Sequence, residues 1–467
     1  MMFDYLNDSL KPLSVILGAD VAALRLLLSI LSAYPLAIFY RKYIYGREKN
    51  AHHLYFISTG LFLAYLNYGT DTLHLMASMV TSYVFLALLG GTYLAVACVF
   101  VFNMIYLSIG YYVMSTDSYD INWTMPHCVL TLKLIGVCID YYDGHQVEEK
   151  LNADSKKFML KTLPNSLEFL GFCCFPASFM VGPQFGMKRY QSFVAGEFGD
   201  KSNRSKAPES EFAALQRFAL GVLYLVFFQL LGLLISDDYL ISEGFQEKSF
   251  LWKHLLLGVW GRFTLYRYIC CWLLAEGGCI LFGITYNGVD ERGHKKWDGL
   301  QNIKLSLIEN TREFNDYIKS FNINTNHWIA HYVFKRLKFL GNRNLSQLGA
   351  LLFLAVWHGY HSGYFLTFLL EFLVIYLERD VKSIVKSNKK LTQFFDNALV
   401  DIVVKFLLRI YTFVFMGFCL VPFALLTFEK YWIVMKSINY SGVILFGLYP
   451  FVFGPLLRAA LRESKMD

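Results

Sequence analysis

Apolar runs of about twenty residues recur along almost the whole chain, and they limit the folds open to it. A helix needs about 20 apolar residues to cross the hydrocarbon core of a bilayer. Only 17% of the residues are charged, against about 25% in an average soluble domain. The sequence also lacks the polar–apolar alternation, over roughly ten-residue segments, of a transmembrane β-barrel. We therefore predict an all-α polytopic membrane protein.

The apolar runs form three groups, at about residues 21–114, 128–284 and 348–457. A polar segment at about 287–345, rich in charges and aromatic residues, separates the second group from the third. Several runs are too short for a full crossing, and broken helices of this kind line cavities in membrane enzymes and transporters. We expect one membrane domain over residues 1–467, with about ten or eleven transmembrane helices around a central cavity.

Charged residues around the first run, Val21–Tyr40, indicate its orientation. Asp4 and Asp8 precede it. Four basic residues follow it: Arg41, Lys42, Arg47 and Lys49. Basic residues favour the cytosolic side, so we expect an uncleaved span with a luminal N-terminus and place the polar segment 287–345 at the cytosolic side. The net charge of +7 fits such anchoring, and we expect no nucleic-acid partner because no compact basic domain is present.

An unusual histidine, His358, lies inside the apolar run Leu348–Leu377, which we interpret as one span. A titratable side chain is costly in lipid, so it usually faces a protein interior or a watery cavity. Histidine also moves protons near neutral pH. The alternative is a hydrogen-bonded helix residue that packs against Trp357. His361 lies three positions further on, so we expect it on the same helix face as His358, close to any substrate.

The second candidate is Asn322, in the polar stretch FNINTNHW. An intervening helix that returns the chain would place Asn322 and His358 in one cavity. A neutral imidazole can take the proton from an alcohol that attacks an activated carbonyl. A carboxamide can donate a hydrogen bond to the developing oxyanion, or hold the imidazole or the attacking hydroxyl. The pair thus indicates acyl transfer without a serine or cysteine nucleophile.

Other polar residues near this pair have weaker interpretations. His327 and His331 stand four positions apart, but no third ligand accompanies them, so we expect no metal site. Glu371 lies about 20 Å from His358 along a straight helix, too far to orient it. Apolar residues at helical spacing predict an amphipathic helix over Ile303–Ile318.

A basic cluster follows the asparagine segment: Lys335, Arg336 and Lys338. Basic residues in this position are typical of cytosolic anchoring beside a membrane. They also suit phosphate groups at the mouth of a cavity. Both interpretations are compatible with the sequence.

Several stretches together resemble the membrane-bound O-acyltransferases (MBOAT), and among them the lysophosphatidylcholine acyltransferase branch. They are FNINTNHW, YVFKRLKFLGN, LAVWHGYHSGYF, LKLIGVCIDYYDG and FMVGPQFGM. The resemblance runs from about Leu132 to Glu371. It implies that His358 and Asn322 are the family's essential histidine and asparagine, in a cavity open to the cytosol and the membrane.

The same resemblance implies an activity. A fatty acyl group would pass from acyl-CoA to the sn-2 hydroxyl of a lysophospholipid, mainly lysophosphatidylcholine and also the ethanolamine and serine forms. Acyl-CoA is then a co-substrate, no cofactor is expected, and membrane lipids are the other partners. The family also implies a multi-pass protein of the endoplasmic reticulum that remodels phospholipids, and a homo-oligomer is compatible with it.

We accordingly predict that His358 and Asn322 are catalytic. Trp357 and His361 would contact substrate, and the basic cluster would contact the phosphates of CoA. Two alternatives stay open: a different acceptor, such as a sterol, diacylglycerol or peptide, and a lipid transporter or scramblase with broken helices around a polar cavity.

Overall fold

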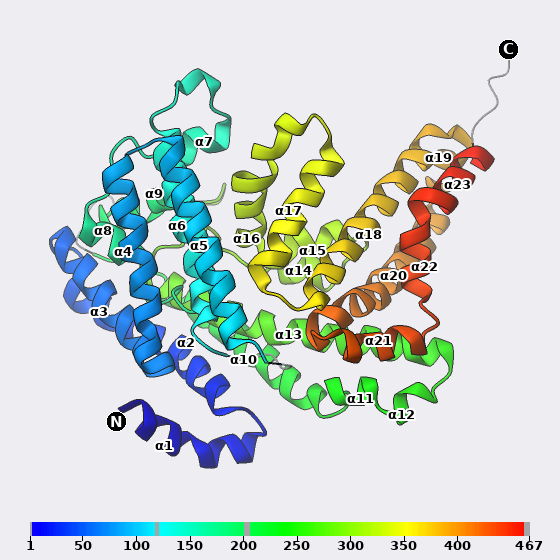
Figure 1. Cartoon of the computed structure of the whole chain (residues 1–467), viewed down its shortest axis with the longest axis horizontal. Helices are drawn as coiled ribbons and strands as arrows, with labels where there is room; N and C mark the ends of the chain where they lie inside the picture. The colour runs from blue at the N-terminus through cyan, green and yellow to red at the C-terminus, as the bar shows by residue number, and fades with distance from the viewer. Residues whose placement is uncertain (1, 117–120, 200–205, 462–467) are drawn as a thin grey trace.

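A computed structural model describes residues 2–116, 121–199 and 206–461. Helices make up most of these residues (Figure 1), and the only β-type pairings among them are two isolated bridges, Val289 with Lys295 and Ile303 with Phe321. The predicted all-α class is thus confirmed for the described chain.

Six helices form the N-terminal third, where apolar runs alternate with short turns. They are α1 (Met2–Leu17), α2 (Val21–Phe39), α3 (Lys49–Tyr68), α4 (Thr72–Leu89), α5 (Tyr93–Met114) and α6 (Thr124–Asp143). Most residues of α6 are buried on every side of the helix. These buried residues include polar ones such as Lys133 and Asp140, so α6 packs inside the protein rather than against lipid.

The middle third contains two long helices, with short helices before the first of them and between the two. They are α7 (Ala153–Phe158), α8 (Ser166–Cys173), α9 (Met187–Val194), α10 (Glu211–Gly232), α11 (Asp237–Ile241), α12 (Glu243–Gln246) and α13 (Phe250–Phe282). In Figure 1 the green helix α13 runs across the lower half of the view, and it packs against α2, α10 and α20.

The last third begins with short helices that lead into a hairpin and a C-terminal group. They are α14 (Leu305–Ile308), α15 (Phe314–Ser320), α16 (Ile323–Ile329), α17 (Arg343–His358), α18 (Ser362–Ser387), α19 (Lys389–Phe395), α20 (Ala398–Leu425), α21 (Phe428–Ser437), α22 (Ser441–Leu448) and α23 (Gly454–Leu461). The predicted amphipathic helix over Ile303–Ile318 is wrong, because α14 and α15 are separate short helices.

Close contact between α13 and α20 depends on glycine. A Cβ atom added to Gly261 would lie only 2.3 Å from the Cα of Gly417. Small residues let helix backbones approach in membrane proteins, where lipid supplies no hydrophobic force between helices. This crossing holds the centre of α13 against the C-terminal half of the molecule.

Seven helical stretches of the described chain are long and apolar enough to cross a membrane. They are Val21–Ile44, Lys49–Leu89, Tyr93–Met114, Glu211–Ile241, Phe250–Phe282, Ala398–Leu425 and Ser441–Leu461. The chain is therefore a multi-pass membrane protein, while the predicted count of ten or eleven crossings is not confirmed. Part of the difference lies within the second apolar group, where residues 166–181 contain no helix longer than the eight-residue α8.

The predicted span Leu348–Leu377 is divided in two. Helix α17 ends at His358, α18 begins at Ser362, and the two helices pack together. Between them Gly359 has φ +135°, a conformation that residues with a Cβ rarely adopt. The continuous apolar pattern concealed this break, which places His358 at a helix end rather than in the middle of a span.

Candidate active site

A cavity of about 690 Å³ lies among α13, α16, α17, α18 and α20, and residues of α2, α5 and α6 complete its wall. Its size suits a small-molecule or lipid ligand. Of the described residues that line it, only Asp20, Arg267 and Glu371 have side chains that are ordinarily charged at neutral pH. The cavity therefore combines a largely apolar wall with uncharged polar side chains and three charged ones, as suits an amphipathic ligand.

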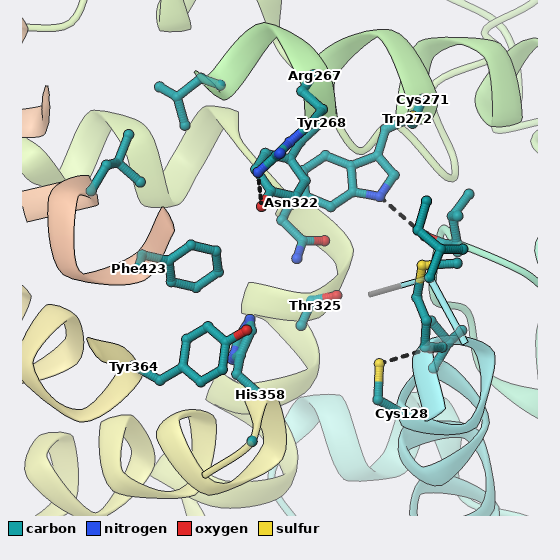
Figure 2. A pocket seen from close by; sticks show the side chains of 18 of the residues that line it. Cys128, Arg267, Tyr268, Cys271, Trp272, Asn322, Thr325, His358, Tyr364 and Phe423 are labelled. Carbon is teal, nitrogen blue, oxygen red and sulfur yellow. Dashed lines mark hydrogen bonds between the residues drawn. The ribbon is translucent and has the colours of Figure 1, made fainter. Parts of the chain in front are cut away.

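His358 and Asn322 both line this cavity. His358 is the last residue of α17, and Asn322 immediately precedes α16. In Figure 2 the Asn322 side chain lies above that of His358 near the middle of the view, and both point toward the space between them. The structure thus brings the two predicted residues together, as the sequence led us to expect.

A backbone hydrogen bond determines the tautomer of His358. Its Nδ1 lies 2.8 Å from the carbonyl oxygen of Leu354. A carbonyl oxygen only accepts hydrogen bonds, so Nδ1 must carry the hydrogen. In a neutral imidazole, Nε2 then has no hydrogen and presents a lone pair. The geometry therefore prepares Nε2 of His358 to accept a proton.

Aromatic rings hold the imidazole in place. The ring centroids of Trp357, Phe368 and Phe423 lie 4.6, 5.2 and 5.3 Å from that of His358. Trp357 is itself fixed, because its indole N–H donates to the carbonyl oxygen of Cys128 at 2.9 Å. Trp357 thus lines the cavity and also supports the imidazole of His358. Its predicted contact with substrate stays a prediction.

The structure corrects the predicted relation between His358 and His361. His361 does not share a helix with His358, because it is the residue that precedes α18. It still lines the cavity, from the short connection that joins α17 to α18. Glu371 also lines the cavity. The single straight helix assumed between His358 and Glu371 is wrong, because α17 ends at His358 and α18 begins at Ser362.

Asn322 has a backbone conformation that suits its residue type. Its φ of 48° and ψ of 44° lie in the left-handed region, which asparagine tolerates better than most residues with a Cβ. The chain turns there between α15 and α16, so that Asn322, Thr325 and Asn326 all reach the cavity wall.

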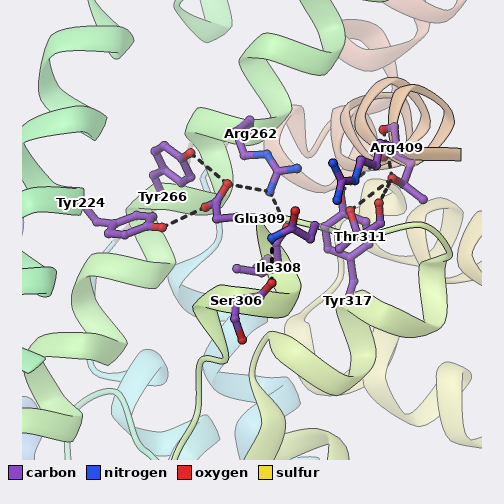
Figure 3. Close-up of polar contacts among 11 residues, drawn as sticks. Tyr224, Arg262, Tyr266, Ser306, Ile308, Glu309, Thr311, Tyr317 and Arg409 are labelled. Atoms are coloured by element: carbon purple, nitrogen blue, oxygen red, sulfur yellow. Dashed lines mark hydrogen bonds and ion pairs between the residues drawn. The ribbon is translucent and has the colours of Figure 1, made fainter. Parts of the chain in front are cut away.

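The segment that leads to Asn322 is tied to the long helices by Glu309 (Figure 3). The hydroxyl of Tyr224 on α10 donates to Glu309 Oε1 at 2.9 Å, and that of Tyr266 on α13 reaches Oε2 at 3.5 Å. Arg262 of α13 lies 3.7 Å from the same carboxylate and donates to the carbonyl oxygen of Ile308 at 2.9 Å. These contacts stabilise the position of α14, and with it the chain before the site.

The basic cluster does not line the cavity in the described structure. Lys335 pairs with Asp154, and its ammonium group holds the pKa of that carboxyl below the ordinary value. Arg336 makes two contacts with the buried Asp143, at 3.2 and 2.6 Å. Lys338 is also outside the cavity wall. These two ion pairs join α6 and α7 to the chain after α16. The sequence pattern gave no sign that Asp143 and Asp154 would be the partners of this cluster.

One cationic side chain of the cavity wall escaped the sequence analysis. Arg267 lies in α13, one residue before Tyr268, and its Nη2 donates to the Tyr268 hydroxyl at 3.0 Å. In Figure 2 both residues lie close to Asn322 in the view. The signal was present in the sequence, since a charged residue in an apolar run usually faces a cavity.

His331, the second of the two spaced histidines, is a packed residue. Its ring lies 5.5 Å from that of Phe158 and 4.3 Å from that of Tyr332. Burial lowers its pKa to about 4. His331 therefore stays neutral at physiological pH.

Comparisons with known proteins agree with this geometry. The model of the family described as MBOAT, membrane-bound O-acyltransferase family, matches residues 108–421. Lysophospholipid acyltransferase 5 of Mus musculus is 44% identical, covering 98% of this chain and 93% of that protein. The proteins of the same name from Homo sapiens and Drosophila melanogaster are 43% and 41% identical, covering 98% and 96% of this chain and 93% and 90% of their own. The matched region contains both Asn322 and His358.

Proposed function

Since this chain belongs to the membrane-bound O-acyltransferase family, we propose that it transfers a fatty acyl group from acyl-CoA to the sn-2 hydroxyl of a lysophospholipid. The observation that carries the proposal is the placement of the His358 imidazole and the Asn322 amide in one largely apolar cavity. The names of the similar proteins support a lysophospholipid as the acceptor.

In the proposed reaction, Nε2 of His358 accepts the proton of the lipid hydroxyl as its oxygen attacks the thioester carbonyl. An ester C–O bond forms and the C–S bond breaks. The departing sulfur of CoA takes the proton back from the imidazolium, so the products are a phospholipid and CoA thiol. Substrates that fill the cavity would exclude water and so limit hydrolysis of the thioester.

The wall of the cavity fits both parts of a lysophospholipid. Apolar side chains suit the fatty chains, and the guanidinium of Arg267 suits the phosphate, because arginine binds phosphate oxygens through several N–H groups. We propose lysophosphatidylcholine as the main acceptor, with the ethanolamine and serine forms also used. The proposed site of action is the endoplasmic reticulum membrane, where this reaction remodels phospholipids.

The test uses the full-length protein purified in detergent. Acyl-CoA and lysophosphatidylcholine should together release CoA thiol and yield phosphatidylcholine, identified by mass spectrometry. His358→Ala should abolish both signals while the protein elutes and melts as the wild type does. Lysophosphatidylethanolamine, lysophosphatidylserine, cholesterol, diacylglycerol and a peptide acceptor are run in parallel. Thiol release with one of the last three and with no lysophospholipid would contradict the proposed acceptor.

A labelled lipid in reconstituted vesicles separates an enzyme from a scramblase. We expect the label to appear in a new phospholipid only when acyl-CoA is present. Movement of the label between leaflets, unchanged in covalent structure and insensitive to His358→Ala, would instead support lipid transport.

A further inference from the structure

The orientation of the Asn322 amide can be deduced from its neighbour Asn302, which is only 1% exposed. The backbone N–H of Asn324 donates to Asn302 Oδ1 at 3.0 Å. A backbone N–H is always a donor, so the oxygen of the Asn302 amide must face it. The Nδ2 group of Asn302 then lies on the other side, where it donates to Asn322 Oδ1 at 3.3 Å.

We infer that Asn302 is a positioning residue that turns the carboxamide oxygen of Asn322 away from the cavity and presents its NH₂ group to the substrate. The Asn322 Nδ2 has no hydrogen-bond acceptor among the described residues, although Asn322 lines the cavity. Figure 2 shows this blue nitrogen on the side nearer His358 in the view. Asn322 is therefore a hydrogen-bond donor toward the cavity, whereas its carboxamide by itself could present either a donor or an acceptor there.

Asn302 is itself held by a buried carboxylate. Glu276 of α13 is 2% exposed, and its Oε1 accepts the backbone N–H groups of Asn302 and, at 2.9 Å, of Ile303. Its other oxygen lies 3.2 Å from Nε of Arg217 on α10. A buried carboxylate with charged and backbone partners is a rigid support, because leaving any of these groups unpaired is costly.

Asn302 also contacts the two residues that follow Asn322 in the chain. Its carbonyl oxygen accepts the backbone N–H of Ile323 at 3.1 Å. The side chain of Asn324 donates to Asn302 Oδ1 at 3.2 Å and to the carbonyl oxygens of Leu300 and Gln301, both at 3.1 Å. Residues 300–303 therefore form a bracket that links α13 to the turn at Asn322.

The orientation has a chemical consequence for acyl transfer. Negative charge develops on the thioester oxygen when the hydroxyl attacks, and an N–H donor aimed at it stabilises the transition state. A carboxamide oxygen in the same place would repel that charge. This consequence rests on the proposed function in one respect: a hydroxyl must attack an acyl carbonyl. Every O-acyltransferase reaction includes that step, whatever the acceptor.

The substitution Asn302→Asp tests the inference with almost no change in shape. One carboxylate oxygen still accepts from Asn324, but the other now faces Asn322. Because carboxylates only accept hydrogen bonds, the Asn322 amide should turn over and donate its NH₂ to the new acid. We expect kcat to fall about 100-fold, as when an oxyanion donor is removed. The KM values for acyl-CoA and lipid should stay within about twofold, because a donor used only in the transition state contributes nothing to substrate binding.

Asn322→Gly supplies the benchmark, since it removes the donor and keeps a residue that adopts positive φ. If Asn302 acts through Asn322, the double variant Asn302→Asp/Asn322→Gly should be no slower than Asn322→Gly alone. Asn302→Ser, which removes the amide without adding charge, guards against a folding defect of the aspartate and should show a smaller fall in kcat. Asn310→Asp is the matched control, because this exposed asparagine lies in the same segment and its side chain donates to the carbonyl oxygen of Ser306 rather than to a residue of the cavity wall.

The variants separate a positioning role of Asn302 from a purely structural one. A wild-type kcat in both Asn302 variants, or multiplicative losses in the double variant, would overturn the role of Asn302. The measurement uses whichever acceptor the wild-type protein accepts, so a failure of lysophospholipids contradicts the proposed acceptor and leaves the comparison of variants intact. A fall in melting temperature with unchanged kcat would show a purely structural role and would also contradict the inference.

Discussion

At the scale of single residues, backbone contacts decide what the two candidate side chains can do. The carbonyl oxygen of Leu354 sets the tautomer of His358, and the N–H of Asn324 sets the amide of Asn302 and through it that of Asn322. The residue types alone indicated a base at His358 and a hydrogen-bonding carboxamide at Asn322. Their orientation depends on partners that a motif does not reveal, and Asn302 stands twenty positions before Asn322.

The left-handed backbone of Asn322 predicts different effects for two truncations. Asn322→Ala and Asn322→Gly should both lose activity, since each removes the carboxamide. Alanine should also destabilise the protein by about 1 kcal/mol, because its Cβ is strained at positive φ, whereas glycine is not. Melting in detergent, followed by tryptophan fluorescence, should place the alanine variant below the glycine variant. An alanine variant that melts at or above the temperature of the glycine variant would contradict backbone strain at position 322.

His331 predicts a pH dependence of stability. Burial lowers its pKa from the ordinary 6.5 to about 4, so between these values the unfolded chain binds a proton that the folded chain does not. Stability therefore rises with pH across this window and is lost as pH falls, by on the order of 2 kcal/mol. Neither ring nitrogen has a hydrogen-bond partner among the described residues, so His331→Phe should keep the packing and flatten the dependence. An equal slope of melting temperature against pH in both proteins would exclude His331 as its source.

At the scale of elements, the break between α17 and α18 is the main departure from the sequence interpretation. The run Leu348–Leu377 is mostly apolar at both of its ends, so its pattern favoured one span. Gly359 was the available signal, because a glycine inside an apolar run often marks a change of backbone. Its positive φ depends on the packing of the two helices, which a local pattern does not contain.

Gly359→Ala should therefore damage the site. The added Cβ is strained at φ +135° and would lie 3.3 Å from Cε2 of Tyr364, a ring next to His358. We expect a lower melting temperature, and a kcat reduced at least tenfold because small displacements of a catalytic group are costly. Gly447→Ala in α22, where nothing lies within 4 Å of the new Cβ, is the control. Wild-type kcat in Gly359→Ala would show that the turn does not position His358.

At the scale of the whole molecule, the cavity is built from segments far apart in sequence, between Gly18 and Leu426. Ion pairs outside it connect the same segments. The buried Asp143 at the end of α6 binds Arg336, which follows α16 in the chain. Nothing in the sequence connects Arg336 with this acid nearly two hundred positions away, so its charge and position alone suggested a contact with phosphate.

The two assignments of Arg336 predict different results for Arg336→Gln. If the ion pair is structural, the variant should lose about 1–3 kcal/mol of stability, because Asp143 is left buried without its partner. The KM for acyl-CoA should then stay unchanged. Asp8→Asn, which breaks the exposed pair with Lys11, should alter neither quantity. A tenfold rise in the KM for acyl-CoA at an unchanged melting temperature would support the predicted contact with the phosphates of CoA.

The sequence by itself determined the helical, membrane-embedded class and singled out Asn322 and His358, because the length of an apolar run and the chemistry of a side chain are local properties. Only the tertiary structure decided which helices are continuous, which cations line the cavity and which atom of each candidate faces it. Those features arise from contacts between distant segments, such as Glu276 with Asn302 and Arg336 with Asp143, and their energies appear only when the chain has folded.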